Sequence, residues 1–185
     1  MSSGINEEHI SSERIYEGRI INFRVDTIRL PNGKTSTREI VEHRGAVAIV
    51  PILGYDTVIL VRQYRTAAGG PLLEIPAGTR EPNEDITLCA SRELAEEINF
   101  HPGRIYQLFE SFMAPGYTSE LIHTFLALDL EPVDGHTDED EFLEIVHMPL
   151  DEAIELIGKG EIRDGKSIGG LLYAAKVLPE YRNRK

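Results

Sequence analysis

Residues 78–100, GTREPNEDITLCASRELAEEINF, contain the pattern on which the interpretation of this chain depends. If residues 84–98 are helical, the apolar residues at spacings of three and four form one stripe facing the core: Ile86, Cys89, Ala90, Leu94 and Ile98. Glu93, Glu96 and Glu97 then lie on an adjoining face, in the later turns of the helix. Carboxylates at this spacing repel one another, and they stand towards the negative end of the helix dipole. Such crowding needs a physical reason.

Two explanations fit the acidic face. It is either a solvated surface, which is the usual role of neighbouring glutamates, or a binding site for a divalent cation. Clustered carboxylates with no histidine or cysteine partner nearby favour magnesium or manganese, with waters and substrate phosphates completing the coordination shell. A cation site also explains why the acids adjoin the core stripe and why a tight turn, Pro76-Ala77-Gly78, precedes them.

The composition indicates an acidic globular protein. Of its 185 residues, 41% are hydrophobic and 27% charged, which argues against disorder. The formal net charge of −12 disfavours nucleic acid as a partner, although a bound cation could bridge the protein to an anionic substrate. Cys89 is the only cysteine, so no intrachain disulfide can form. The start of the chain has no apolar signal-peptide core, and no apolar run is long enough to span a bilayer, so we expect a cytoplasmic protein.

The remaining patterns predict a mixed sheet with helices packed on it. Residues 1–13 look weakly ordered, and two strands flank the hairpin signal Asn32-Gly33. The near-continuous apolar run AVAIVPIL, residues 46–53, predicts a strand buried on both faces. Further strands are expected over residues 57–65, 72–75, 105–112, 120–130 and 142–147. Two final helices begin near Pro149 and after Ser167, which is a reasonable N-cap.

The acidic helix and the turn before it resemble the Nudix signature, which is glycine, five residues, glutamate, seven residues, then Arg-Glu-apolar-x-Glu-Glu-x-Gly-apolar. The matching residues are Gly78, Glu84, Arg92, Glu93, Leu94, Glu96, Glu97 and Phe100. The single departure is Asn99, where the family usually has glycine. This position follows the helix, where the chain tends to turn left-handed, and asparagine is the best non-glycine residue there.

Three other segments resemble the ADP-ribose pyrophosphatases of this superfamily: VRQYR at 61–65, LLEIPAG at 72–78 and APGYTSE at 114–120. In that subfamily a proline typically lies about sixteen residues past the glycine position of the signature, and Pro115 occupies that place. The resemblance implies an α/β fold, namely an α/β/α sandwich with a mixed β-sheet and an N-terminal β-hairpin. We expect a flexible N-terminus over residues 1–13, N-terminal strands over 14–44 and a Nudix hydrolase domain over 45–185.

The resemblance also implies roles for individual residues. Glu93, Glu97 and the backbone carbonyl of Ala77 are expected to bind Mg²⁺, or Mn²⁺ in its place. Glu96 is expected to bind the metal directly or through water. Glu84 is expected either to share in this site or to form a salt bridge with Arg92.

The general base is expected within the acidic loop DGHTDEDE, where Glu141 is the first candidate and Glu139 the second. Its position on a loop would let it act when substrate closes the site. Arg65 is expected to face the substrate diphosphate or terminal ribose, since arginine forks match phosphate oxygens. The weaker substrate-binding candidates are Arg44, Glu74, Thr79 and Pro115.

The reaction implied is Mg²⁺-dependent hydrolysis of ADP-ribose to AMP and ribose 5-phosphate. In the resembled subfamily the N-terminal hairpin is exchanged across a homodimer, and the partner chain helps to bind the adenine. Two alternatives remain: hydrolysis of another nucleotide sugar of the GDP-mannose type, and a non-catalytic module that senses nucleotides. Such modules commonly have a degraded signature, whereas every acid of the signature is present here.

Overall fold

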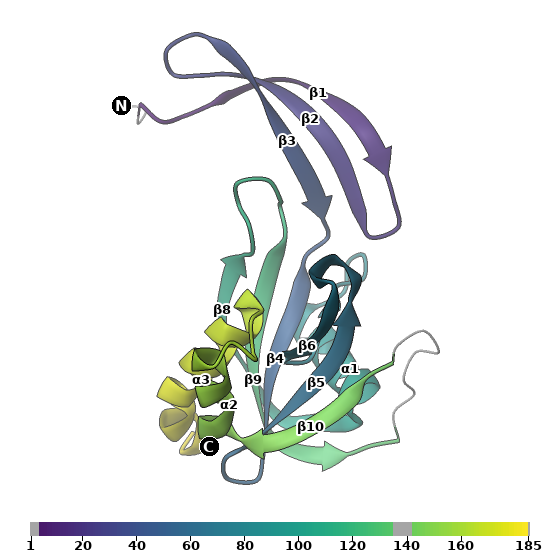
Figure 1. Cartoon of the computed structure of the whole chain (residues 1–185), viewed down its shortest axis with the longest axis vertical. Helices are drawn as coiled ribbons and strands as arrows, with labels where there is room; N and C mark the ends of the chain where they lie inside the picture. Colours follow the sequence, from purple (N-terminus) through teal and green to yellow (C-terminus); the bar gives the residue numbers. More distant parts are fainter. Residues whose placement is uncertain (1–3, 135–141, 185) are drawn as a thin grey trace. The chain divides into compact units, whose positions relative to one another are not determined.

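The computed structural model describes residues 4–134 and 142–184, which belong to two compact units (Figure 1). The first unit comprises the chain up to Gly45 together with Phe112–Leu121. The second comprises Ala46–Ser111 together with the chain from Ile122 onwards. Among the described residues, no helix is both long and apolar enough to cross a membrane.

The first unit is built on a three-stranded antiparallel sheet in the order β1-β2-β3 (Figure 1). Its strands are β1 (Glu8–Glu17), β2 (Ile21–Arg29) and β3 (Thr35–His43). The two strands predicted around Asn32-Gly33 are therefore confirmed. The weak order predicted for residues 1–13 is wrong for residues 8–13, because β1 pairs with β2 along its length. Ladder hydrogen bonds hold this strand, whose side chains are all exposed, so the polar sequence gave no apolar pattern to detect.

The turn between β2 and β3 follows from its residues. The Gly33 N–H donates to the Leu30 carbonyl over 2.8 Å, and the Leu30 N–H donates to the Lys34 carbonyl over 2.8 Å. Gly33 has a φ of 82°, a left-handed conformation that glycine adopts without steric cost. Beyond β3, the 114–119 loop adds to this sheet, since the Val41 N–H donates to the Tyr117 carbonyl over 2.8 Å.

The second unit contains a seven-stranded sheet with the central order β10-β5-β4-β9-β8. Strands β4 and β9 are parallel, whereas β4 with β5 and β5 with β10 are antiparallel, so the sheet is mixed as predicted. Strand β6 pairs with β5, and β7 pairs with β4. The strand bounds are β4 (Ala46–Leu53), β5 (Thr57–Arg65), β6 (Gly70–Glu74), β7 (Ala77–Thr79), β8 (Phe100–Phe112), β9 (Leu121–Pro132) and β10 (Glu144–Pro149). A short 3₁₀ turn, Thr66–Ala68, precedes β6.

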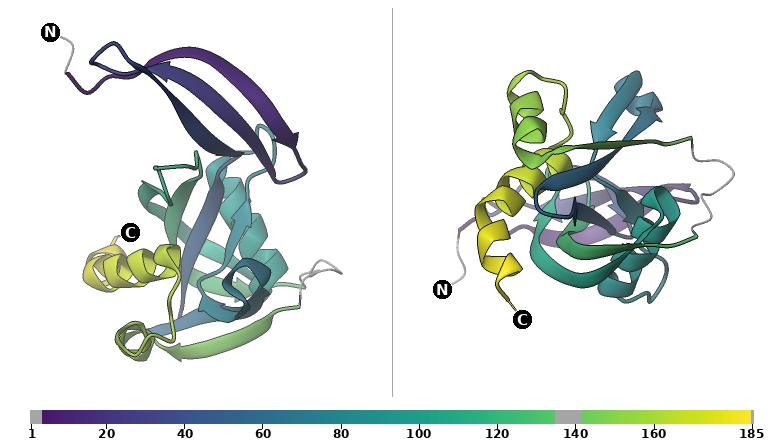
Figure 2. Two further views of the ribbon diagram at one scale, coloured as in Figure 1. Left: turned by 45° about the horizontal axis from the view of Figure 1, so that its top comes forward. Right: turned by 90° about the horizontal axis from the view of Figure 1, so that it is seen from below.

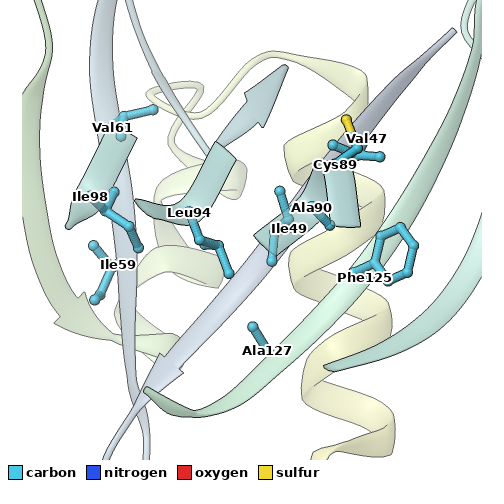
Figure 3. Close-up of a cluster of buried hydrophobic side chains, with 10 residues drawn as sticks. All are labelled: Val47, Ile49, Ile59, Val61, Cys89, Ala90, Leu94, Ile98, Phe125 and Ala127. Atoms are coloured by element: carbon cyan, nitrogen blue, oxygen red, sulfur yellow. The ribbon is translucent and has the colours of Figure 1, made fainter. Parts of the chain in front are cut away.

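Helices cover both faces of this sheet because its central strand is apolar on both sides. Val47 and Ile49 of β4 belong to a buried cluster with Cys89, Ala90 and Leu94 of helix α1 (Ile86–Ile98), shown in Figure 3. Side chains that alternate along a strand point to opposite faces. Val50, the next residue after Ile49, accordingly faces the other side and meets helix α3 (Gly165–Arg182), where a Cβ on Gly170 would lie 3.2 Å from the Val50 Cγ2. Helix α2 (Leu150–Gly158) packs on α3 and β10 (Figure 2).

The helix ends agree with the predictions in two cases out of three. Asp85 caps α1, and Asn99 ends it with a φ of 60°, the left-handed conformation predicted there. Helix α2 begins at Leu150, directly after Pro149. The N-cap predicted for the last helix is wrong: Asp164 caps α3 by accepting from the Ser167 N–H. Ser167 lies in the first turn with its hydroxyl turned to the sheet, where the Ile75 N–H donates to it.

Candidate active site

Helix α1 presents its acids at different depths. Glu93 and Glu97, one turn apart, are buried, with exposed fractions of 8% and 3%. Glu96 is more accessible, since 36% of its side chain is exposed. Two carboxylates taken out of water at adjacent turns are costly unless other groups compensate them. The burial therefore argues against a merely solvated acidic face.

Two residues of strand β7 contact these two glutamates. A Cβ on Gly78 would lie 1.9 Å from Cδ of Glu93, so only glycine leaves room for that carboxylate. The Ala77 N–H donates to Oε2 of Glu97 over 3.1 Å. The structure thus brings together Ala77, Glu93 and Glu97, three of the four expected metal-binding residues.

The backbone of Ala77 points away from β4. The Ile49 N–H donates to the Pro76 carbonyl over 2.8 Å, whereas Ala77 stands opposite Ala48. In an antiparallel ladder, hydrogen-bonded pairs alternate with pairs whose N–H and C=O groups face outwards. Ala77 belongs to the second kind, as the bond from its N–H to Glu97 also indicates. The sequence predicted that the chain leaves the sheet as a turn at residues 76–78, but residues 77–79 continue as the short strand β7.

Arg92 compensates the charge of the acidic helix. Its guanidinium forms a bidentate pair with Glu84, at 2.8 and 3.0 Å, and lies 2.8 Å from Oε1 of Glu93 and 2.7 Å from Oε2 of Glu96. Of the two expectations for Glu84, the salt bridge to Arg92 is therefore the one observed. One arginine thus contacts three carboxylates. In the described ranges, no group of three or more His, Cys, Asp or Glu side chains is placed to hold a metal ion.

The pKa values of this cluster reflect the same contacts. The hydrogen bond from Arg92, opposed by burial and assisted by the Glu81 N–H, lowers the pKa of Glu84 to about 2. The bond to Glu84 raises the pKa of Arg92 above its already high ordinary value. Burial, followed by the neighbouring Glu84, raises the pKa of Cys89 to about 12. Cys89 is therefore a neutral packing residue of the helix, as its place in the apolar stripe predicted.

A second charged cluster lies at the end of β6. Arg65 donates two hydrogen bonds to Glu74, each of 2.9 Å, and Lys166 donates to the same carboxylate over 2.5 Å. Lys166 also bonds Asp164, at 3.1 and 3.2 Å. Glu74 is only 2% exposed, whereas 39% of the Arg65 side chain is exposed. Glu74 thus anchors an arginine that still faces solvent.

Charge pairing decides the ionisation of this cluster. Burial raises the pKa of Glu74, but the Arg65 hydrogen bonds and the Lys166 charge outweigh it and hold the pKa below its usual value. The pKa of Arg65 is raised, first by its bond to Glu74 and also by the charge of Glu97. Glu97 and Glu74 thus act electrostatically on the same guanidinium. Sequence reasoning missed Lys166 and Asp164, which lie more than 85 positions from Glu74 and carry no local pattern; only the DGKS helix start was detectable.

The other expected substrate-binding residues are distributed over both units. Thr79 ends β7 opposite Ala46. In the first unit, Pro115 lines a cavity of about 460 Å³ together with Arg24 and Arg38. Arg44 lines a different cavity of the same unit, of about 280 Å³. Pro115 and Arg44 thus line two different cavities of that unit.

The two candidates for the general base, Glu139 and Glu141, lie outside the described residues. The groups near β7 that could bind a metal ion are oxygens. They are the buried carboxylates of Glu93 and Glu97 and the carbonyl of Ala77, which lies outside the ladder. Oxygen donors of this kind suit magnesium and manganese better than softer metals. The chain's own residues therefore fit a hard divalent cation.

Comparison with known proteins places the chain in a family. Residues 42–168 match the NUDIX domain, and residues 7–41 match the nucleoside diphosphate sugar hydrolase N-terminal domain. A methanol dehydrogenase activator of Bacillus methanolicus is 37% identical over 94% of this chain and 95% of its own length. An ADP-ribose pyrophosphatase of Bacillus subtilis (strain 168) is 35% identical over 91% of this chain and 92% of its own. A crystal structure of an ADP compounds hydrolase superposes with a TM-score of 0.85 and 26% identity, covering 100% of both chains.

The chain belongs to the NUDIX family, and the predicted α/β fold of that family is confirmed. It is a Nudix pyrophosphohydrolase of the type that acts on nucleotide sugars. Enzymes of this family generally depend on a divalent metal, which agrees with the oxygen donors around β7.

Proposed function

We propose that this enzyme hydrolyses the diphosphate bond of ADP-ribose to AMP and ribose 5-phosphate with Mg²⁺ as cofactor, Mn²⁺ being able to replace it. The observation that carries the proposal is the burial of Glu93 and Glu97 against β7, where Gly78 leaves room for one carboxylate and the Ala77 N–H bonds the other. The ADP-ribose pyrophosphatase and the ADP compounds hydrolase similar to this chain support the substrate class.

Glu93, Glu97 and the Ala77 carbonyl would hold the cation, and the more exposed Glu96 would bind it directly or through water. When bound, the cation would supply positive charge against the substrate diphosphate and would activate water for attack. Arg92 screens the acids from one another by pairing with Glu93 and Glu96. This arrangement lets a protein with a net charge of −12 bind an anion.

Arg65 would contact the diphosphate or the terminal ribose. Its two hydrogen bonds to Glu74 fix the plane of the guanidinium, and its partly exposed side chain leaves donors for a ligand. Thr79, Arg44 and Pro115 are further candidates for contacts with the substrate. Glu141, with Glu139 as second candidate, would accept the proton of the attacking water.

We further propose that the enzyme acts in the cytoplasm as a homodimer in which the N-terminal sheet of one copy contributes to the other. The support is the exposure of large apolar side chains along β1 and its turn to β2, including Ile15 at 52%, Tyr16 at 58% and Ile20 at 53%. Exposed apolar groups concentrated on one segment mark association surfaces. Light scattering coupled to size exclusion should give twice the mass of one chain, and Ile15→Asp should shift it towards the monomer.

The test of the reaction is turnover of a panel of nucleotide sugars by purified protein with Mg²⁺, with Mn²⁺ and with EDTA. We expect release of AMP from ADP-ribose, well above the turnover of GDP-mannose, and its loss in EDTA. Fastest turnover of another nucleotide sugar would reject the substrate while keeping the metal site. Nucleotide binding without turnover of any compound would instead support the non-catalytic sensor.

Glu97→Gln is the informative variant because it keeps the size of a buried side chain and removes its charge. It should lose turnover by at least about a hundredfold while keeping the far-ultraviolet circular dichroism of the parent. Glu161→Gln is the matched control, since Glu161 is an exposed residue between α2 and α3. Equal activity of the two variants would contradict the role assigned to Glu97.

A further inference from the structure

The start of helix α3 is tied to the segment that joins β6 to β7. The Ile75 N–H donates to the Ser167 hydroxyl over 2.8 Å, and the two residues are 92 positions apart in the sequence. Both residues are completely buried, so no water competes for this bond. One residue earlier in each segment, Lys166 bonds the Glu74 carboxylate. Two consecutive residues of α3 therefore hold the last residue of β6 and the first residue of the joining segment.

The residues that follow Ile75 are held by β4 and by helix α1. Pro76 has no N–H, and its carbonyl accepts from the Ile49 N–H over 2.8 Å. The next N–H, that of Ala77, donates to Glu97. The bond from Ile75 to Ser167 thus fixes the backbone two residues before Ala77, whose carbonyl is the expected metal ligand.

Ser167 is itself held rigidly. Its N–H donates to both oxygens of the Asp164 carboxylate, at 3.1 and 3.2 Å, which fixes the first turn of α3. One turn further, a Cβ on Gly170 would lie 2.9 Å from Cδ1 of Ile75, so the helix lies directly on the segment it anchors. A hydroxyl fixed in this way can determine where the backbone of residue 75 lies.

We propose that Ser167 is a positioning residue for the metal site: by holding the Ile75 N–H, it sets the direction of the Ala77 carbonyl towards the cation. The inference rests on the proposed function, because it takes that carbonyl to be a metal ligand. Removing the hydroxyl leaves a buried N–H without its partner, and the segment shifts to find another. Mutating a group that does not bind the metal but holds a metal ligand in position typically lowers metal affinity by about 10- to 100-fold.

The test is Mn²⁺ binding, measured from the electron paramagnetic resonance signal of free Mn²⁺, together with the Mg²⁺ concentration that gives half-maximal turnover. Ser167→Ala should weaken Mn²⁺ binding about tenfold and raise the half-activating Mg²⁺ concentration by a similar factor. Ser167→Thr keeps the hydroxyl and should recover most of the affinity. The KM for the nucleotide sugar at saturating Mg²⁺ should change little.

Ile162→Val is the control for stability. Ile162 is buried and 1% exposed, it precedes α3 and it contributes no hydrogen-bonding side chain, so this variant loses packing alone. It should lower the melting temperature without changing Mn²⁺ binding. Unchanged Mn²⁺ binding in Ser167→Ala, or an equal loss in Ile162→Val, would overturn the positioning role.

The wild-type protein separates this inference from the proposed reaction. Mn²⁺ binding without turnover of any nucleotide sugar would reject the reaction, and the affinity of Ser167→Ala would still decide the role of Ser167. Absence of Mn²⁺ binding by the wild-type protein would overturn the metal site and the positioning role together.

Discussion

Gly78 provides the space that the carboxylate of Glu93 occupies. A Cβ at residue 78 would lie 1.9, 2.0 and 2.1 Å from the three carboxylate atoms of Glu93. The backbone fixes the Cβ position, so a residue with a Cβ fits here only if the Glu93 carboxylate moves away. Gly78 and Glu93 of the Nudix signature therefore depend on each other sterically: the glutamate carboxylate fits only because residue 78 has no side chain.

Gly78→Ala should displace Glu93 and lower kcat by at least about a hundredfold, the usual effect of misplacing a reacting group by about 1 Å. The melting temperature should also fall. Gly158→Ala is the control, since a Cβ there meets nothing within 4 Å and its helical position favours alanine. Steady-state kinetics of both variants would test this, and wild-type kcat in Gly78→Ala would contradict it.

The pairing of Glu84 with Arg92 should make stability depend on pH below about 4.5. The pKa of Glu84 is about 2 in the folded protein, against an ordinary value of 4.5. The pair therefore stabilises the fold fully above about pH 4.5, and this contribution is lost as the pH falls towards 2. Urea unfolding at pH 6, 4 and 3 should show a smaller decline for Glu84→Gln than for the parent.

At pH 6, Glu84→Gln should itself cost about 1 kcal/mol, since the pair is partly exposed. Glu161→Gln, which changes an exposed acid, provides the comparison. A decline with pH as steep in Glu84→Gln as in the parent would assign the acid sensitivity to other groups.

Two arginine–glutamate pairs on β5 should differ strongly in their effect on stability. Glu74 is 2% exposed and pairs with Arg65, whereas the side chain of Glu144 is 67% exposed and pairs with Arg62 over 3.1 Å. Glu74→Ala should lower the free energy of unfolding by about 3 kcal/mol, because it empties a buried site and leaves the mostly buried Lys166 with Asp164 as its remaining acid. Glu144→Ala should cost less than about 1 kcal/mol. Urea denaturation measures both, and similar losses would contradict this distinction.

Asn99 should be replaceable by glycine but not by alanine. It ends α1 with a φ of 60° and a ψ of 40°, and its N–H donates to the Leu94 carbonyl. Alanine in this left-handed conformation should cost about 1 kcal/mol, whereas glycine should leave stability within about 0.5 kcal/mol of the parent or raise it. Thermal unfolding of the two variants would decide; a large loss in Asn99→Gly would show that the asparagine side chain itself is needed.

Much of the fold could be predicted because it follows from local patterns. The apolar run of residues 46–53 became the central strand, and the periodic stripe of residues 86–98 became the helix packed on it, as the buried cluster in Figure 3 shows. Strand β1 escaped prediction because its side chains are all exposed. Its order comes from pairing with β2, which no pattern within residues 8–17 encodes.

The sequence by itself determined the family, the acidic helix and the left-handed end of that helix, since each depends on residues within a few turns of one another. Only the tertiary structure decided how the charges are compensated. The guanidinium of Arg92 contacts three carboxylates. Lys166 bonds Glu74 at the end of β6, and the Ser167 hydroxyl accepts from the N–H of the next residue, Ile75. Such contacts form only when helix and sheet pack together. Burial makes an unpaired charge or N–H group costly, and the packing decides which partner lies close enough to pair with it.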